Sequence, residues 1–555
     1  MTKPPSAQSN VCANGFSVET ACVPRFLFRY MGAIQIVRGD FCSVEKEYAI
    51  ELKQVTKCFG DVIANDKVDL SVRKGEILSI LGENGSGKTT LMNILSGIYS
   101  PDTGRIFMDG KEVTIRSPKD SFALGIGMIH QHFKLINVLT AAENIILGLP
   151  GKERLKMNQV IDEINSLTQK YGFELNPTQK IYDMSVSQKQ TVEIIKVLYR
   201  GAEILILDEP TAVLTPQETK KLFDVLRNMK NTGKSIVIIT HKLSEVLEIS
   251  DRVSVLRKGK YIGTVETGAS TAESLTEMMV GEKVSLDINR DEPVEPVKRI
   301  EVRGITCRSK EGNFALKEIS FTANSGEILG IAGIAGSGQK ELLEAIAGLQ
   351  EIESGEILYY APEGNTEKIS EMKAADIRNL KINLAFVPED RLGMGLVGSM
   401  DLTDNMLLRS YQEGKYFFAD RETPKKLALD IVDKLDVVTP GVDTPVRRLS
   451  GGNVQKVLVG REIASNPRVL MVAYPVRGLD INSSYTIYNL LNEQKKKGVA
   501  VICVGEDLDV LLELCDRILV LAGGKVTGIA DARSVTKDEL GLMMTSSKRG
   551  GHKHG

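Results

Sequence analysis

Apolar residues in this chain gather in short, uninterrupted runs. One run, ILIL, stands directly before Asp208, and another, VAVICV, stands before Gly505. Apolar runs of about four to eight residues are typical of strands in a parallel sheet that is covered on both faces. A similar run at 75–81 precedes a glycine-rich loop, and a helix-like pattern follows that loop at 90–98. The pattern predicts buried parallel strands that alternate with helices.

The same order of elements occurs in two halves of the chain. In each half a strand leads into a glycine loop and a helix, a mostly helical stretch follows, and a further strand ends at a second motif. This alternation predicts a doubly wound α/β core. In such a core, phosphate groups bind where the glycine loop meets the N-terminus of the helix.

The two halves are copies of one unit. Gly82 and Gly333 are equivalent positions 251 residues apart, whereas Ser185 and Ser450 are equivalent positions 265 residues apart. A single change of register in the middle of the unit accounts for the difference, because loops there tolerate insertions. Such long collinearity indicates that the unit was duplicated.

The repeat divides the chain into five parts. We expect domains at 47–288 and 300–545, joined by a linker at 289–299 that contains two prolines and alternating charges. Residues 1–46 have no sustained periodicity and lack the apolar stretch of a secretory signal, so we expect a disordered extension or the product of an upstream start codon, with a targeting or regulatory arm as the alternative. Residues 546–555 form a polar, basic tail.

Composition narrows the class of protein. The 70 basic and 72 acidic residues leave a net charge of −2, which argues against nucleic acid as the main partner. The seven cysteines are scattered, which favours reduced thiols over disulfides or a zinc site. No stretch approaches the roughly 18 consecutive apolar residues of a membrane-spanning helix.

The loop GENGSGKT at 82–89 has the form of a phosphate-binding loop. We expect Lys88 to reach the β- and γ-phosphates and the Thr89 hydroxyl to ligate Mg²⁺. In ILILDEP, Asp208 is expected to hold Mg²⁺ and Glu209 to act as the base for hydrolysis. The ATP-binding residues expected from the loop are Gly82, Glu83, Asn84, Gly85, Ser86, Gly87, Lys88, Thr89 and Thr90.

The segment LSGGNVQK at 449–456 resembles the signature motif of the ATP-binding cassette (ABC) superfamily. The resemblance covers about residues 49–545. It implies tandem ABC-type P-loop NTPase domains, each with a RecA-like doubly wound core, an antiparallel β part and a helical signature subdomain. In that family two cassettes associate head to tail, and each ATP lies between the P-loop of one cassette and the signature of the other.

The resemblance also assigns residues to the ATP site. Gln131 matches the Q-loop glutamine, which senses Mg²⁺, and His241 matches the switch histidine, which contacts the γ-phosphate. Phe59 matches the aromatic residue that stacks on adenine, with an ordinary core phenylalanine as the alternative. The implied Mg²⁺ ligands are Thr89, Gln131 and Asp208. The residues that the second unit would add to this site are Ser450, Gly451, Gly452, Asn453 and Asp480.

The second unit lacks most of the phosphate-handling residues. The degenerate positions are Gln339 for the lysine, Ala473 for the aspartate, Tyr474 for the glutamate, Glu506 for the histidine, Glu389 for the Q-loop glutamine and Lys310 for the aromatic residue. Conversely, the first signature carries Val186 and Ser187 in place of two glycines. Head-to-tail association would collect the intact elements in one site and the altered ones in the other. We therefore expect one hydrolytic site.

Three segments are similar to those of the ATPase subunit of simple-sugar and nucleoside importers. They are the degenerate glycine loop of the second unit, VPEDRLGMGL at 387–396 and YPVRGLD at 474–480. Segment 128–148 resembles the nucleoside branch more, with uptake of ribose, galactose or xylose as the alternative. The resemblance implies a peripheral protein on the cytoplasmic face of the membrane, bound to permease subunits and through them to an extracytoplasmic solute-binding (lipo)protein. A soluble tandem ABC ATPase that acts on ribosomes or nucleic acid is a remote alternative.

Overall fold

The computed structural model describes residues 48–131, 133–149, 156–283, 288, 290–293, 295–309, 312–379, 383–411 and 420–545. The expected extension at 1–46, the tail at 546–555 and the position of Lys310 lie outside them. All described residues belong to one compact unit. No helix in these ranges is both long and apolar enough to cross a bilayer.

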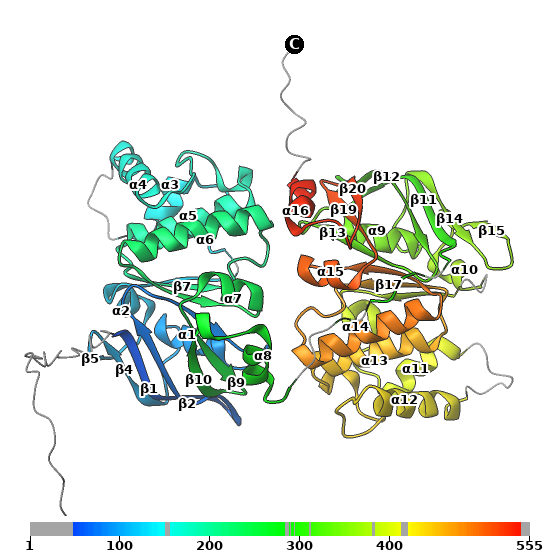
Figure 1. Ribbon diagram of the computed structural model, residues 1–555, viewed down its shortest axis with the longest axis horizontal. Helices are drawn as coiled ribbons and strands as arrows, with labels where there is room; N and C mark the ends of the chain where they lie inside the picture. The colour runs from blue at the N-terminus through cyan, green and yellow to red at the C-terminus, as the bar shows by residue number, and fades with distance from the viewer. Residues whose placement is uncertain are drawn as a thin grey trace, which may run out of the picture. The chain divides into compact units, whose positions relative to one another are not determined.

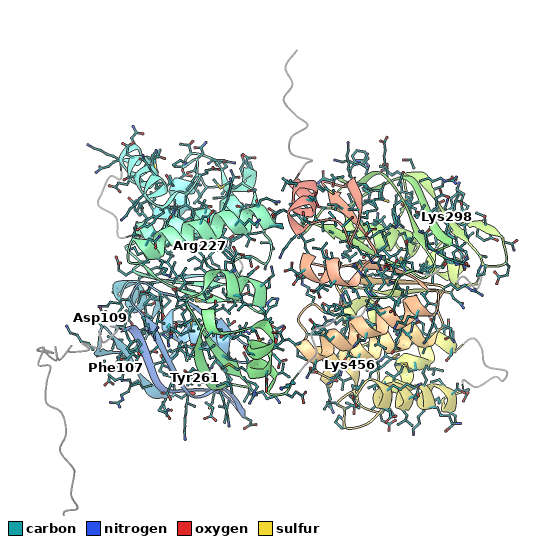
Figure 2. All side chains as sticks on the ribbon, in the orientation of Figure 1. Phe107, Asp109, Arg227, Tyr261, Lys298 and Lys456 are labelled. Atoms are coloured by element: carbon teal, nitrogen blue, oxygen red, sulfur yellow. The ribbon has the colours of Figure 1, made fainter. Side chains whose placement is uncertain are left out.

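Among the described residues, the first copy forms two sheets (Figure 1). The antiparallel sheet, in the order β2-β1-β4-β5, contains β1 (Tyr48–Phe59), β2 (Val62–Arg73), β4 (Thr103–Met108) and β5 (Lys111–Val113). The mainly parallel sheet, in the order β10-β9-β3-β8-β7-β6, contains β3 (Ile77–Leu81), β6 (Ile126–Ile129), β7 (Ile204–Asp208), β8 (Ser235–Ile239), β9 (Arg252–Arg257) and β10 (Lys260–Glu266). Buried and exposed positions are mixed in the antiparallel sheet, from which Phe107 projects (Figure 2).

Helices of the first copy cover the parallel sheet and build a separate helical subdomain. They are α1 (Lys88–Leu95), α2 (Pro118–Ala123), α3 (Ala141–Ile146), α4 (Met157–Tyr171), α5 (Val186–Tyr199), α6 (Pro216–Asn231), α7 (Leu243–Ile249) and α8 (Ala272–Val280). The helices α3, α4 and α5 contact one another and form the subdomain (Figure 1). The signature segment of the first copy lies at the start of α5.

The second copy repeats this arrangement. Its antiparallel sheet, in the order β12-β11-β14-β15, contains β11 (Lys298–Arg308), β12 (Phe314–Asn324), β14 (Ser354–Tyr360) and β15 (Thr366–Lys368). Its mainly parallel sheet, in the order β16-β17-β18-β13-β19-β20, contains β13 (Ile328–Gly333), β16 (Leu384–Val387), β17 (Val469–Ala473), β18 (Ala500–Val504), β19 (Arg517–Ala522) and β20 (Lys525–Asp531). Its helices are α9 (Gln339–Ile346), α10 (Ala374–Asn379), α11 (Leu402–Ser410), α12 (Glu422–Lys434), α13 (Gly451–Ala464), α14 (Ile481–Lys496), α15 (Leu508–Leu514) and α16 (Lys537–Thr545).

The strand order of the two parallel sheets is the same when each is followed from the edge strand β6 or β16. The predicted tandem α/β fold is therefore confirmed. The apolar runs became strands that are buried along their whole length, as in β7 and β18. Burial on both faces is the reason that polar residues first appear where these strands end.

The boundaries of the first helix differ from the expectation of 90–98. Helix α1 runs over Lys88–Leu95 because Gly87, at φ 95°, leads directly into it. It ends early because Gly97 has a φ of 74°, and a Cβ there would lie 2.3 Å from the Ser117 carbonyl oxygen. The apolar pattern continued past the point at which the backbone leaves the helix.

Candidate functional site

Glycines shape the loop between β3 and α1. Gly85 and Gly87 have φ values of 80° and 95°, a region that favours glycine. A Cβ at Gly87 would lie 2.3 Å from the Ala64 carbonyl oxygen, so no larger residue fits without movement. The Ser86 hydroxyl is buried and has no hydrogen-bond partner among the described residues. An unpaired buried hydroxyl in this loop is consistent with a missing polar ligand.

Lys88 is held inside this loop. Its side chain is buried, and its ammonium donates to the carbonyl oxygens of Gly82 at 2.6 Å and Glu83 at 2.8 Å. Burial lowers the pKa of Lys88, while the carboxylates of Glu209 and Asp208 act in the opposite direction. The loop therefore holds the positively charged Lys88 ammonium close to its glycines. Thr89 and Thr90 follow in the first turn of α1, where Thr89 is exposed.

Asp208 and Glu209 lie where β7 ends. Burial, together with the neighbouring Glu209 carboxylate, raises the pKa of Asp208 to about 6. Glu209 has a φ of 47°, which is uncommon for a residue with a side chain, and its N–H donates to the Ile239 carbonyl oxygen at 2.8 Å. Strained backbone of this kind is frequent at functional sites.

Two side chains hydrogen-bond to the Glu209 carboxylate, one at each oxygen. The Gln131 amide donates to Oε2 at 2.9 Å, and His241 Nδ1 lies 2.9 Å from Oε1. The hydrogen bond from His241 lowers the pKa of Glu209 despite its partial burial. The structure therefore brings two expected site residues, Gln131 and His241, together around the ionised carboxylate of a third, Glu209.

The expected metal ligands have the right chemistry for Mg²⁺. Thr89, Gln131 and Asp208 offer a hydroxyl, an amide and a carboxylate, all of them oxygen donors. Burial and the Glu209 carboxylate both disfavour the ionised form of Asp208 and raise its pKa, and a bound cation would favour that ionised form. Among the described residues, no three His, Cys, Asp or Glu side chains form a metal cluster. The expected Mg²⁺ ligands are not a cluster of that kind, because only one of the three, Asp208, is a carboxylate.

The second copy contributes to the first P-loop. The Asn84 amide donates to the Leu479 carbonyl oxygen at 3.4 Å, and the Ile481 N–H donates to the Glu83 carboxylate at 3.4 Å. Between them stands Asp480, whose carboxylate accepts from the Ser483 N–H at 2.7 Å and so caps α14. The structure thus places Asp480 next to the P-loop of the other copy.

Two further contacts join the copies. Near the start of α6, Gln217 donates to the Asp538 carbonyl oxygen of α16 at 2.8 Å. Near the start of α14, Asn482 donates to Glu282, which follows α8, at 3.1 Å. Each copy thus uses the start of an equivalent helix, α6 or α14, to contact the other.

The second signature lies at the N-terminus of α13. Ser450 caps this helix by accepting from the Asn453 N–H at 3.4 Å and from the Asn453 amide at 3.0 Å. A Cβ at Gly452 would lie 3.1 Å from the Ser483 hydroxyl, so the glycine permits close packing against α14. Across the described residues, the second copy's hydrogen bonds to the first P-loop are made by Leu479 and Ile481, on either side of Asp480, and not by the signature segment, which includes Gly451.

Phe59 is not a core residue. Its side chain is 44% exposed, which makes the alternative of an ordinary core phenylalanine wrong. Its ring lies edge to face with Tyr99, with centroids 5.2 Å apart. Sequence reasoning missed Tyr99, because its only signal is a lone aromatic residue soon after α1.

The second P-loop keeps its shape without its lysine. Gly336 and Gly338 have φ values of 82° and 102°, close to those of their first-copy equivalents. Gln339 is buried, and its amide donates to the Ile334 carbonyl oxygen at 3.1 Å. Gln339 thus keeps a hydrogen bond of the kind that Lys88 makes, but it carries no charge.

Tyr474 occupies the backbone position of Glu209. Its φ is 48°, and its N–H donates to the Val504 carbonyl oxygen at 2.9 Å. Burial raises the pKa of Tyr474 to about 12, so the phenol is neutral at physiological pH. The second copy has therefore kept the turn and lost the carboxylate that could act as a base.

Around Tyr474 the charges are the reverse of those in the first copy. Arg477 forms ion pairs with Glu389 and with Glu506, the latter at 3.1 Å. Where the first copy has a carboxylate between Gln131 and His241, the second has a cation between two carboxylates. The sequence analysis had placed Glu389 and Glu506 at degenerate positions, but it did not identify Arg477 as their common partner.

Both copies of the unit are similar to known proteins. A family model described as ABC transporter matches residues 65–212 and again 316–475. Among solved structures, a nucleotide-free ATP-binding cassette from an ABC transporter is 25% identical, with a TM-score of 0.37, over 42% of this chain and 96% of its own.

Three curated relatives are similar over most of this chain. The nucleoside import ATP-binding protein NupA of Lactococcus lactis is 41% identical, over 90% of this chain and 98% of its own length. The guanosine import ATP-binding protein NupO of Bacillus subtilis is 40% identical over the same shares. The ribose import ATP-binding protein RbsA 1 of Rubrobacter xylanophilus is 38% identical, again over 90% and 98%. With both copies matched and the strand order repeated, the chain belongs to the ABC transporter family as an ATPase with two cassettes.

Proposed function

We propose that this chain is the ATP-hydrolysing motor subunit of a membrane importer for nucleosides. The observation that carries the ATPase part is the Glu209 carboxylate, held between Gln131 and His241 at the carboxyl end of β7. A carboxylate with a lowered pKa is ionised at neutral pH and can orient a water molecule and accept its proton.

In this proposal ATP lies on the first P-loop. Backbone amides of 84–90 and the Lys88 ammonium hold the phosphates, and the exposed ring of Phe59 stacks on adenine. When bound, Mg²⁺ neutralises phosphate charge, and Thr89, Gln131 and Asp208 would hold it. Glu209 accepts a proton from the attacking water, and His241 stays within hydrogen-bond distance of that carboxylate.

The second cassette completes this site and has no hydrolytic site of its own. Asp480 stands beside the first P-loop, and the Ser450 signature at the N-terminus of α13 offers backbone amides for a γ-phosphate when the cassettes close. The neutral phenol of Tyr474 cannot replace Glu209 as a base. ATP binding would close the cassettes, and hydrolysis would release them.

Nucleosides are the proposed cargo because the nucleoside and guanosine relatives reach 41% and 40% identity. Uptake of a simple sugar is the second candidate, favoured by the ribose relative at 38%. The proposal places the chain on the cytoplasmic face of the membrane, with permease subunits that communicate with an extracytoplasmic solute-binding (lipo)protein.

Reconstitution tests the cargo. The chain, its permeases and its solute-binding protein would be placed in liposomes, and phosphate release would be measured with a nucleoside, ribose or galactose present. We expect the nucleoside to stimulate ATP hydrolysis more than either sugar. Equal or reversed stimulation would remove the nucleoside assignment and leave the ATPase assignment intact.

A further inference from the structure

Arg391 joins two segments of the second copy that lie far apart in the sequence. Its guanidinium donates to the Gly451 carbonyl oxygen at 3.4 Å and to the Arg477 carbonyl oxygen. Gly451 is the first residue of α13 and belongs to the signature segment. Arg477 stands three residues before Asp480, in the loop that leads to α14. One side chain therefore fastens the start of the signature helix to the loop that carries Asp480.

These two segments differ in their contact with the first P-loop. The loop 479–481 forms two hydrogen bonds with the first P-loop, through Asn84 and Glu83. Within the described ranges, the signature segment forms none with that P-loop. Through Arg391, the signature is nevertheless connected to the loop that already touches the first copy. Movement of this loop against the first P-loop would carry the signature with it.

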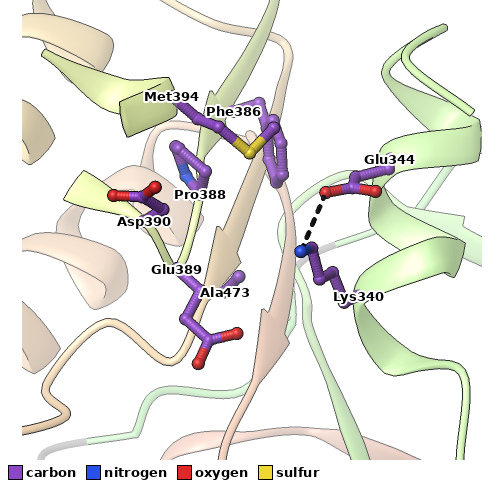
Figure 3. Close-up of a pocket in the computed structure, with 8 residues that line it drawn as sticks. All are labelled: Lys340, Glu344, Phe386, Pro388, Glu389, Asp390, Met394 and Ala473. Carbon is purple, nitrogen blue, oxygen red and sulfur yellow. Dashed lines mark ion pairs between the residues drawn. The ribbon is translucent and has the colours of Figure 1, made fainter. Parts of the chain in front are cut away.

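The segment that carries Arg391 is held in place by hydrogen bonds. Glu389 and Asp390 border a cavity of about 380 Å³ (Figure 3), so close packing does not hold this side of the segment. The Asp390 carboxylate accepts from the Gly393 N–H at 2.8 Å and caps the helical turn that begins at Arg391. The backbone that directs Arg391 toward its two acceptors is thus fixed locally.

The Arg391 guanidinium is partly buried, and among the described residues it forms no ion pair. Burial, together with the neighbouring Arg477 guanidinium, lowers the pKa of Arg391, which still stays charged at physiological pH. Its hydrogen bonds to the two carbonyl oxygens are therefore charge-assisted. Such bonds are roughly twice as strong as bonds between neutral groups, so this link is stronger than an ordinary side-chain contact.

The first copy lacks this link. The strands β6 and β16 end four residues before Phe133 and Arg391, which are therefore equivalent, and a phenylalanine side chain offers no hydrogen-bond donor. At the signature, Val186 takes the place of Gly451. A Cβ at Gly451 would lie 3.3 Å from Arg391 Nη1, so the glycine gives the guanidinium room to reach the carbonyl oxygen. Both members of the contact thus occur in the copy whose signature is intact.

Building on the proposed ATPase function of the first site, we propose that Arg391 is a positioning residue for hydrolysis. It holds the signature and the Asp480 loop in one arrangement, so that both reach the first P-loop together. Arg391 does not itself bind the nucleotide, and it acts through Gly451 and the loop 477–480. Without this link the two segments would approach the phosphates independently, and the site would close less often in the reactive geometry.

Steady-state phosphate release by the full chain, with ADP binding measured beside it, tests this role. ADP lacks the terminal phosphate that the signature would approach, so its affinity should not depend on the position of the signature. Arg391→Met should lower kcat about tenfold or more, because two charge-assisted hydrogen bonds are lost, and should change the Kd of ADP by less than about twofold. A kcat within about twofold of the native value would overturn the proposal. A parallel loss of ADP affinity would show general damage and would overturn it as well.

Two further variants separate the guanidinium fork from its charge and from its neighbour. Arg391→Lys keeps the charge but has a single ammonium group, so its rate should stay at least about threefold below native, and a native rate would overturn the double link. This variant also carries the test if a thermal unfolding curve shows that Arg391→Met does not fold. Arg477→Gln is the matched control, because it removes a neighbouring guanidinium and leaves the Arg477 carbonyl oxygen in place. It should keep the native rate within about twofold, and a loss equal to that of Arg391→Met would overturn the link.

The native chain and Glu209→Gln, measured in the same series, distinguish failure of this role from failure of the proposed function. Hydrolysis that is lost in Glu209→Gln but kept in Arg391→Met would overturn the role of Arg391 alone. Absence of hydrolysis by the native chain would overturn the proposed ATPase and, with it, this role of Arg391.

Discussion

Arg477 pairs with Glu506 at 3.1 Å in the second cassette, at the place where the first cassette pairs His241 with Glu209 at 2.9 Å. The histidine position has become a carboxylate, and the anion at the centre has been replaced by a cation from three residues further along. The second cassette has therefore exchanged a network suited to activating water for one that neutralises itself. The two networks explain why the copies share a fold and differ in chemistry.

Replacement of Asp208 should separate stability from metal binding. A carboxyl group whose pKa is raised to about 6 in the folded protein favours the fold when protonated, and this contribution is lost as pH rises from about 4 to about 6. At pH 7, Asp208→Asn should therefore stabilise the nucleotide-free protein by about 1–3 kcal/mol. Urea unfolding at several pH values measures this difference.

The stability gain of Asp208→Asn should shrink to a few tenths of a kcal/mol near pH 4, where the wild-type carboxyl group is protonated in the folded state and about half protonated in the unfolded state. The same variant should lose Mg²⁺-dependent ATP binding. A stability difference that is the same at pH 4 and pH 7 would contradict the raised pKa of Asp208.

Binding of Mg²⁺ at the first site should weaken in acid. Protons compete with the metal for Asp208 below about pH 6, so affinity should fall by up to about tenfold for each further pH unit. Titration with Mn²⁺ as a spectroscopic substitute, between pH 5 and pH 8, provides the measurement. An affinity that is flat across this range would show that Asp208 does not bind the metal.

Substitutions at equivalent signature positions should have unequal effects in the two copies. Gly451→Val should lower ATP hydrolysis at least about tenfold, because a bulky side chain would crowd the helix N-terminus that approaches the first site. Val186→Gly should change hydrolysis less than about twofold, because the site it serves has Gln339 and Tyr474. A rise in activity from Val186→Gly would mean that the second P-loop hydrolyses ATP.

Removal of the central cation of the second copy should leave the first site active. Arg477→Gln leaves Glu389 and Glu506 without their ion-pair partner, and we expect the rate of phosphate release to change by less than about twofold, because Glu209 and its two hydrogen-bond partners are untouched. Because the three side chains of the ion-pair network are all partly exposed, unfolding stability should change by less than about 1 kcal/mol. Arg477→Lys is the matched control, and a loss of rate by Arg477→Gln as large as that of Glu209→Gln would contradict the separation of the two networks.

The fold and the first site were largely readable from the sequence because their signals are local. Apolar runs marked β7 and β18, and the spacing of Lys88 within its loop marked the phosphate cradle. The end of α1 was misplaced because the apolar pattern continues through Gly97, which has a φ of 74° and has no room for a Cβ beside the Ser117 carbonyl oxygen.

The remaining features depend on tertiary contacts. Arg477 meets Glu389 and Glu506 only after β16, β17 and β18 are aligned in one sheet, so no local pattern could pair them. The exposure of Phe59 likewise depends on how the strands β1 and β2 meet at their turn.

The central claim is that the chain has one hydrolytic site, built on Glu209. The most direct measurement compares steady-state phosphate release by Glu209→Gln and Tyr474→Phe, with ATP binding checked for both. We expect Glu209→Gln to lose about 10²–10⁴-fold in rate while it still binds ATP, and Tyr474→Phe to keep most of the native rate. Equal damage from the two substitutions, or a Glu209→Gln variant that still hydrolyses ATP at the native rate, would contradict the account.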